Sequence, residues 1–194
     1  MEQEQKTQTQ DAILLAALKL FAEKGYFNTS LNDIANAAGL NSTTALYQYF
    51  SNKHQIAATL HASILDSLNV SIDEIRRKNS KPSEQLHGVV DLLFKLTDEA
   101  PAVTQFILTL NTNEFLPETK SLNDTAAFTK ILKIIRAGIS EGEIRPIDAV
   151  LANAYFFGIV HNTLRMVLSG ALEKKAEAYL SQTWLIAWNA IAKK

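Results

Sequence analysis

The chain has 194 residues, of which 47% are hydrophobic, and a formal net charge of −1. This length is sufficient for a real core in one or two small domains, and the charge balance by itself gives no indication of a nucleic-acid partner. Because the sequence has no cysteine, disulfides and thiolate metal sites are excluded. No apolar run approaches the roughly 18 residues that a membrane helix needs, so we expect no membrane association.

The chain is predicted to be helical throughout, because it contains only 7 glycines and 4 prolines and shows no period-two alternation. The first ten residues, MEQEQKTQTQ, are polar and unlike a signal peptide, and we expect them to form a frayed arm. A first helix is predicted over about residues 9–23, where the apolar residues recur at helical spacing.

Residues 25–53 carry the strongest local signals in the chain. Ser30 followed three residues later by Asp33 is a capping-box pattern that starts a short helix. Gly39 predicts the end of this helix, because glycine adopts a left-handed conformation without steric cost. Asn41 or Ser42 can then cap a second short helix. The pattern predicts two short helices joined by a tight turn.

Two such helices have a shape that fits the DNA major groove. The second helix begins with small polar side chains that can approach base edges, and a tyrosine hydroxyl or a lysine can contact phosphate. We therefore predict nucleic-acid contacts from Thr29, Ser30, Asn41, Ser42, Thr43, Thr44, Tyr47, Gln48, Tyr49 and Lys53.

Six further helices are predicted after this segment. Ser51 is expected to cap a long helix that keeps one apolar stripe to about residue 75. Helices then follow over about residues 83–100, 103–110 and 124–141, with residues 111–123 as the most loop-like stretch. The last two helices are expected over about residues 148–169 and 172–192, which gives about nine helices in total.

The last two predicted helices are more apolar than a helix with one face in solvent usually is. Residues 149–160 are apolar on nearly all sides, and the final helix places aromatic and aliphatic residues on one stripe. Such surface suggests a subunit interface, although both helices could instead be buried in their own core. The residues predicted for the interface are Tyr155, Phe156, Leu180, Trp184, Ala187, Trp188 and Ile191.

The segment from Ile13 to Ile56 resembles the N-terminal domain of the TetR family of transcriptional regulators. A second stretch, Glu141 to Asp148, resembles the turn before the penultimate helix of many members, and together the two cover about a third of the chain. The matching positions in the first segment are Ile13, Ala16, Ala17, Leu20, Phe21, Gly25, Tyr26, Thr29, Ser30, Asp33, Ile34, Ala35, Ala38, Gly39, Leu46, Tyr47, Tyr49, Phe50 and Lys53.

The resemblance implies an all-α protein in two parts. Residues 1–55 would form a three-helix domain with a helix-turn-helix motif at about 30–49, and residues 56–194 a helical ligand-binding and dimerisation domain. It further implies a cytoplasmic homodimeric repressor without a cofactor, which a small, mostly apolar effector releases from a palindromic DNA operator. The middle helices would then line the effector pocket, for which the candidates are Phe94, Phe106, Asn111, Phe115, Phe128, Phe157 and His161.

Two features depart from the family pattern. Six residues separate Gly39 from Leu46, where the family usually has five, and the extra residue is expected to lengthen the turn or shift the second helix. Between Gly25 and Asn52 there is no lysine or arginine. Since cations normally supply much of the affinity for DNA, we expect a shallow salt dependence. The same deficit leaves an alternative open, a helical ligand-binding or adaptor protein with little or no DNA binding.

Enzymatic readings find little support. The sequence lacks a cysteine nucleophile, a G-x-S-x-G elbow and a glycine-rich phosphate loop. His87 and Asp91 lie one helical turn apart, but such an isolated pair is far more often a surface or capping interaction than a metal site. We therefore expect a protein that is not an enzyme and binds no metal.

Overall fold

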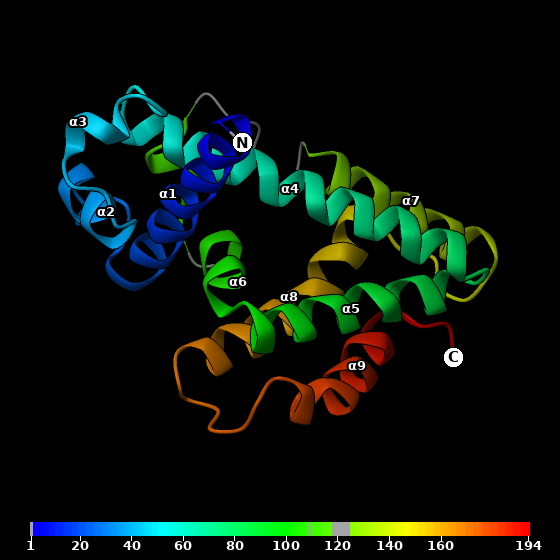
Figure 1. Ribbon diagram of the computed structural model, residues 1–194. Coiled ribbons are helices and arrows are strands. Elements are labelled where there is room, and N and C mark those ends of the chain that lie inside the picture. Colours follow the sequence, from blue (N-terminus) through cyan, green and yellow to red (C-terminus); the bar gives the residue numbers. More distant parts are fainter. Residues whose placement is uncertain (1, 109, 118–124) are drawn as a thin grey trace. The chain divides into compact units, whose positions relative to one another are not determined.

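The computed structural model describes residues 2–108, 110–117 and 125–194 (Figure 1). Nine α-helices and one short 3-10 helix make up its regular structure over these ranges, as expected for the predicted all-α fold. The chain divides into two compact units. The first comprises Met1–Ile64 and Gln105–Thr119, and the second Leu65–Thr104 and Lys120–Lys194.

The first unit is built on helices that pack in sequence, with α2 against both α1 and α3. Its core is formed by fully buried residues such as Ile13, Phe21, Ile34, Leu46 and Phe106. Its helical elements are α1 (Glu2–Lys24), α2 (Leu31–Ala37), α3 (Thr43–Leu46), the start of α4 (Lys53–Lys78), the end of α6 (Pro101–Leu108) and the 3-10 helix η1 (Thr112–Glu114).

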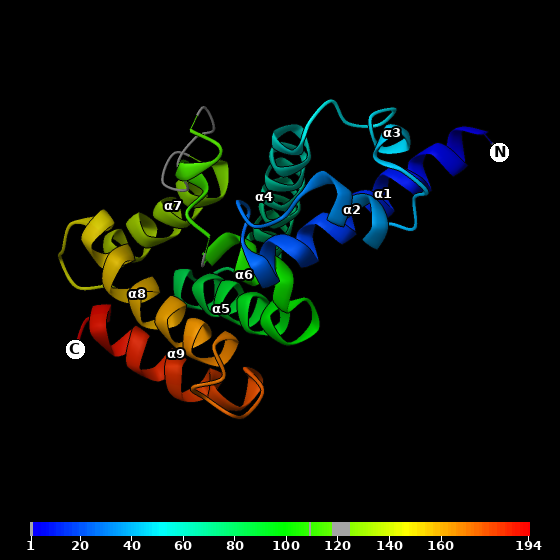
Figure 2. The same ribbon diagram turned by 90° about the vertical axis from the view of Figure 1, so that its left-hand side faces the viewer.

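The second unit is arranged around α8, which packs against α5, α7 and α9 (Figures 1 and 2). Its core residues include Leu86, Phe94, Ile135, Phe156 and Val160, all buried. Besides the end of α4 and the start of α6, it contains α5 (Pro82–Glu99), α7 (Ala126–Ser140), α8 (Ala149–Leu168) and α9 (Glu177–Ile191).

The long helix α4 passes from one unit into the other. It runs without interruption from Lys53 to Lys78, and the boundary between the units falls at Ile64 within it. The predicted domain boundary between residues 55 and 56 also lies inside this helix and stays a prediction.

Local sequence signals explain the starts of α5, α7 and α8. Pro82 occupies the first turn of α5, where its missing N–H costs nothing. Thr125 caps α7, and the carboxylate of Asp148 accepts the N–H groups of Val150 and Leu151, both at 2.9 Å, at the start of α8. The predicted bounds of α7 and α8 are therefore confirmed to within two residues.

Two predicted bounds were wrong. The arm predicted at the N-terminus belongs to α1, which begins at Glu2, because its glutamates, glutamines and lysine are good helix formers. Helix α9 begins at Glu177 instead of residue 172. The bounds of α6, Pro101–Leu108, agree with the predicted helix to within two residues. The predicted loop at 111–123 contains η1, and its residues 118–123 lie outside the described ranges, as does residue 124.

None of the described helices combines the length and the hydrophobicity that crossing a bilayer requires.

Candidate nucleic-acid interface

The first helix of the predicted motif begins with a complete capping box. The backbone N–H of Asp33 donates to Ser30 Oγ at 3.1 Å, and the backbone N–H of Ser30 donates to Asp33 Oδ2 at 2.9 Å. The Ser30 hydroxyl also donates to Asp33 Oδ2 at 2.7 Å, and these bonds lower the pKa of the Asp33 carboxyl. The start of α2 is thus held by its own side chains, as the sequence pattern predicts.

The turn after α2 is a Schellman motif. Gly39 has a φ of +73°, the left-handed region that glycine favours. The N–H of Leu40 donates to Ala35 O at 2.9 Å, and that of Gly39 donates to Asn36 O at 3.1 Å. Ser42 then caps α3, since its Oγ accepts the N–H of Ala45 at 3.3 Å. Of the two predicted caps, Asn41 and Ser42, the structure uses Ser42.

Helix α3 is anchored inside the unit and presents polar side chains outside it. Leu46 and Phe50 are buried, which fixes the helix against the core. Tyr47 is 54% exposed although it is a large aromatic residue. The other predicted contact residues of this stretch are exposed or half-buried: Asn41, Ser42, Thr44 and Gln48 are exposed, and Thr43 and Tyr49 are half-buried. This surface is accessible to a nucleic acid.

Thr29 is placed differently from the prediction. Its side chain is only 1% exposed, and its hydroxyl donates to Gly25 O at 2.9 Å and lies 3.3 Å from Leu20 O. The residue therefore ties the end of α1 to the start of α2, and its side chain is not available to DNA. The hydroxyl of Ser30 is exposed but engaged in the capping box.

Lys53 also has an internal role. Its Nζ donates to Tyr26 O at 2.8 Å and to Thr29 O at 2.7 Å, and lies 4.3 Å from the centroid of the Tyr26 ring. Burial lowers the pKa of this amine. The predicted phosphate contact is thus replaced by a clamp between α4 and the loop before α2. The cap predicted at Ser51 is moved as well, because Asn52 Oδ1 accepts the N–H of Gln55 at 2.7 Å.

An aromatic cluster completes the first unit from far along the chain. The ring of Phe115 stacks on Tyr26, with centroids 4.3 Å apart, and Phe106 lies 6.3 Å from Phe21. The side chain of Gln105 donates to Ala22 O at 2.9 Å. Phe106 and Phe115 were predicted to line an effector pocket, but they are core residues of the unit that carries the helix-turn-helix.

The remaining pocket candidates are divided between the units, with Asn111 in the first and the others in the second. Asn111 is exposed, and its side-chain amide donates to Glu114 Oε1 at 2.9 Å. Phe157 and His161 are neighbours on α8, with ring centroids 5.5 Å apart. Phe128 is half-buried on α7.

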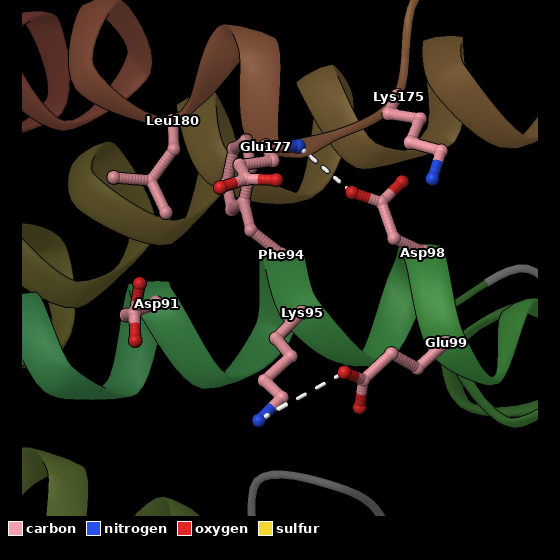
Figure 3. A pocket seen from close by; sticks show the side chains of 8 residues that line it. All are labelled: Asp91, Phe94, Lys95, Asp98, Glu99, Lys175, Glu177 and Leu180. Atoms are coloured by element: carbon pink, nitrogen blue, oxygen red, sulfur yellow. Dashed lines mark hydrogen bonds and ion pairs between the residues drawn. The ribbon is translucent and has the colours of Figure 1, made fainter.

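A groove of about 310 Å³ separates α5 from the segment that leads into α9 (Figure 3). Of the predicted pocket residues only Phe94 lines it, and most other lining side chains are charged. Asp98 accepts the N–H groups of Ala176 at 2.7 Å and Glu177 at 3.0 Å, which caps α9 from α5. Asp91 lies in this groove, whereas His87 packs edge-on against Trp184 at 4.7 Å. No cluster of three or more metal-ligating side chains occurs among the described residues.

The residues predicted for a subunit interface are divided between core and surface. Phe156, Ala187 and Ile191 are fully buried in their own unit, so in this structure their side chains are not accessible to a partner subunit. Trp184 and Trp188 stack on each other at 5.4 Å and are half-buried, as is Leu180. Tyr155 is 46% exposed.

Apart from Tyr155, the exposed apolar residues of these helices lie at positions that the prediction missed. Six of the ten large hydrophobic residues that are exposed in the described chain belong to α8 or α9. Leu151, Tyr155 and Gly158 follow one stripe of α8 at helical spacing, which is the signal that could have revealed this face. The six are Val150, Leu151, Tyr155, Met166, Leu185 and Ile186.

Comparison with known proteins agrees with this geometry. Residues 13–60 match the family described as bacterial regulatory proteins, tetR family. The chain is 25% identical over 187 residues to the HTH-type transcriptional repressor NicS of Pseudomonas putida, covering 90% of this chain and 88% of the relative.

Two solved structures share the fold over nearly the whole chain. A TetR family transcription regulator from Marinobacter aquaeolei has a TM-score of 0.79 at 22% identity and covers 100% of both chains. The regulator FadR from Bacillus subtilis, solved in complex with stearoyl-CoA, has a TM-score of 0.75 at 24% identity and covers 93% of this chain and 98% of the other. The matched segment carries the helix-turn-helix described above, so this N-terminal part of the chain is a domain of the TetR family of bacterial regulatory proteins.

Proposed function

We propose that the protein is a homodimeric repressor that binds a palindromic DNA operator and leaves it when a small, mostly apolar effector binds. The observation that carries this proposal is the surface of α3, where exposed polar side chains project from a helix fixed by two caps and a buried anchor. The repressor NicS, similar to this chain along most of its length, supports the direction of the regulation.

The DNA contacts are assigned to exposed side chains of the motif. We infer that Asn41, Ser42, Thr44, Tyr47 and Gln48 approach bases and phosphates, through hydroxyl and amide groups that can hydrogen-bond to either. Since Lys53 is engaged inside the protein and the motif contains no other cation, few counterions are released on binding. We therefore expect operator affinity to fall only shallowly with salt.

The exposed apolar stripe on α8 and α9 is the proposed dimer surface. At Gly158 an added side chain would meet nothing within 4 Å in its own chain, so a partner helix could approach closely there. Dimerisation matters for recognition, because two helix-turn-helix motifs related by a two-fold axis read half-sites about 34–36 Å apart.

Helix α4 is the proposed link between effector and operator, because it is anchored near both of its ends. At its start Lys53 clamps the loop before α2. Toward its end Asp73 pairs with Lys130 of α7, and the hydrogen bond from Lys130 lowers the pKa of the Asp73 carboxyl. Lys130 also donates to Asn69 O at 3.3 Å. If an effector shifts α7 relative to α4, the movement reaches the clamp at Lys53. Such coupling is typically worth about 1–3 kcal/mol.

Binding to DNA upstream of the protein's own gene tests the proposal. We expect specific retardation of this fragment in a gel, with a shallow dependence on salt. Tyr47→Phe and Thr44→Ala should weaken binding, whereas Tyr179→Phe, the same chemical change at a position in the second unit, should leave it unchanged. Loss of binding in all three variants would contradict the assignment of the contact surface to α3.

One observation favours a second candidate, a ligand-binding protein of the same fold with little or no DNA binding. The motif lacks cations, and Lys53 is engaged with Tyr26 O and Thr29 O. This candidate predicts no specific retardation even at low salt, so the same experiment separates the two functions.

A further inference from the structure

Unpaired buried oxygens are found only in the second unit of the described chain. Three side-chain oxygens are buried without a hydrogen-bond partner among the described residues: Asn69 Oδ1 on α4, Thr104 Oγ1 on α6 and Asn153 Oδ1 on α8. Most buried polar atoms in folded proteins have a partner, so each of these requires an explanation. One explanation is a ligand that supplies the missing donor.

Asn153 lies on the same face of α8 as two residues that fit a ligand site. Phe157 and His161 follow it at intervals of four residues, so the three side chains leave the helix in similar directions. Phe157 is 4% exposed, and its ring lies 5.5 Å from the imidazole of His161. With a rise of 1.5 Å per residue, Asn153 and His161 are about 12 Å apart along the axis. The face thus consists of an aromatic centre between two polar ends.

The polar ends are uncharged. His161 has no hydrogen bond to any residue in the described ranges, and burial alone lowers the pKa of its imidazole to about 4. At neutral pH the ring is therefore neutral and offers one donor and one acceptor. The unpaired oxygen of Asn153 is an acceptor and requires a donor such as a hydroxyl or an N–H group. Neither Asn153 nor His161 would compensate the charge of a carboxylate on a buried ligand.

We propose that the face of α8 formed by Asn153, Phe157 and His161 binds the effector, and that the effector is an uncharged, elongated apolar molecule with a hydrogen-bonding group at each end. This inference rests on the proposed ligand-responsive function and adds the chemical class of the ligand. The end that meets Asn153 carries a donor, and the end that meets His161 carries a hydroxyl, carbonyl or N–H group.

Three rigid compounds of one shape test the chemical class. They are trans-4,4′-dihydroxystilbene, which has a hydroxyl at each end, trans-stilbene, which has none, and stilbene-4,4′-dicarboxylate, which is charged. With the full-length protein we expect the diphenol to bind at least tenfold more tightly than trans-stilbene, and the dicarboxylate to bind more weakly than the diphenol. The proposal is overturned if the diphenol shows no advantage over trans-stilbene, or if the dicarboxylate binds as tightly.

Two variants test the residues. Asn153→Leu and His161→Phe each remove one polar end while keeping the size of the side chain, and each should weaken diphenol binding about tenfold without weakening that of trans-stilbene. Asn153→Leu should also raise the Tm of the free protein, because it removes an unpaired buried oxygen. The control is Asn162→Leu, one residue beyond His161 and exposed. Equal diphenol affinity in the wild type and both variants overturns the assignment.

Failure of this inference can be told apart from failure of the proposed function. Operator retardation without any compound is measured for the wild type and the same variants, and it should be unchanged by Asn153→Leu and His161→Phe. Diphenol binding with no retardation by the wild type contradicts the repressor and retains the site. Retardation without selective diphenol binding contradicts the site and retains the repressor.

Discussion

Buried side-chain oxygens without a hydrogen-bond partner distinguish the two units of the described chain. In the first unit Thr29 and Lys53 donate to backbone carbonyls and tie α1, α2 and α4 together. In the second unit Asn153 and Asn69 hold buried oxygens without a partner, and His161 keeps a neutral, unpaired imidazole. A unit with satisfied polar groups is suited to hold one shape, whereas a unit with unsatisfied groups is suited to accept a ligand.

The strongest challenge to this contrast is the removal of the aromatic packing that closes the first unit. Phe115→Ala should lower the free energy of unfolding by about 4 kcal/mol, because it removes a buried ring that stacks on Tyr26. Urea unfolding followed by circular dichroism measures the change. The control is Phe27→Ala, which alters a neighbour of the same ring that is 66% exposed and should have a much smaller effect. Equal losses in the two variants would contradict a structural role specific to Phe115.

A titration with acid addresses the second unit. The pKa of His161 is about 4 in the folded protein and about 6.5 when unfolded, so the unfolded chain binds the extra proton first. Stability should therefore fall as the pH drops from about 6.5 to about 4, by on the order of 3 kcal/mol for this residue. His61 of the first unit, in which burial also lowers the pKa, contributes in the same direction, so the comparison with His161→Phe isolates the part of the second unit. Thermal unfolding of wild type and His161→Phe at each pH measures the difference.

The pH window distinguishes the histidines from the paired carboxylates. Asp33 and Asp73 have lowered pKa values, so the stability that they contribute is lost only as the pH falls below about 3.8. If wild type and His161→Phe lose stability in parallel between pH 6.5 and pH 4, the imidazole of His161 is not buried in its neutral form.

A substitution of Lys53 tests whether its hydrogen bonds to backbone carbonyls stabilise the first unit. Lys53→Met keeps much of the side-chain length but removes two charged hydrogen bonds, and we expect a loss of about 2 kcal/mol in the free energy of unfolding. The salt slope of operator binding should stay the same. Unchanged stability together with a smaller salt slope would instead identify Lys53 as a phosphate contact.

The smallest expected effect on protomer stability concerns the surface of the second unit. Gly158→Glu places a charge on the exposed stripe of α8, where the added side chain meets nothing in its own chain. We expect the stability of the protomer to change by less than about 1 kcal/mol, since glycine is a poor helix former. Sedimentation should show a monomer, whereas Gly158→Ala should remain dimeric. A dimeric Gly158→Glu variant would place the interface elsewhere.

Features that depend on neighbouring residues were predictable from the sequence. Ser30, Gly39, Ser42 and Asp148 act on backbone groups only a few residues away, so their roles as caps and turn residues could be read from the local pattern. For the same reason the exposed polar surface of α3 was largely anticipated.

Features that depend on distant partners were not predictable. Lys53 binds carbonyls 24 and 27 residues earlier in the chain, so a single lysine beside a motif could equally be a phosphate contact. The start of α9 is set by Asp98, 78 residues before Ala176, and no local signal marks it. Nothing in the sequence around Phe106 and Phe115 indicates that these residues belong to the first unit.

The predicted interface residues show a different limit. Where a helix is apolar on nearly all sides, the pattern indicates burial but not which face meets its own core. Phe156 and Tyr155 are adjacent in the sequence, yet the first is fully buried and the second is 46% exposed. Only the packing of α8 against α5, α7 and α9 separates them.

The discontinuous make-up of the first unit has a consequence for its synthesis. Its core requires Phe106 and Phe115, which leave the ribosome roughly 50 residues after Ile64. At about 5–20 residues per second, this is a delay of about 3–10 s during which α1 and the loop after it exist without the rings that pack on Phe21 and Tyr26. Each molecule therefore completes its helix-turn-helix unit only after all of α5 has been translated.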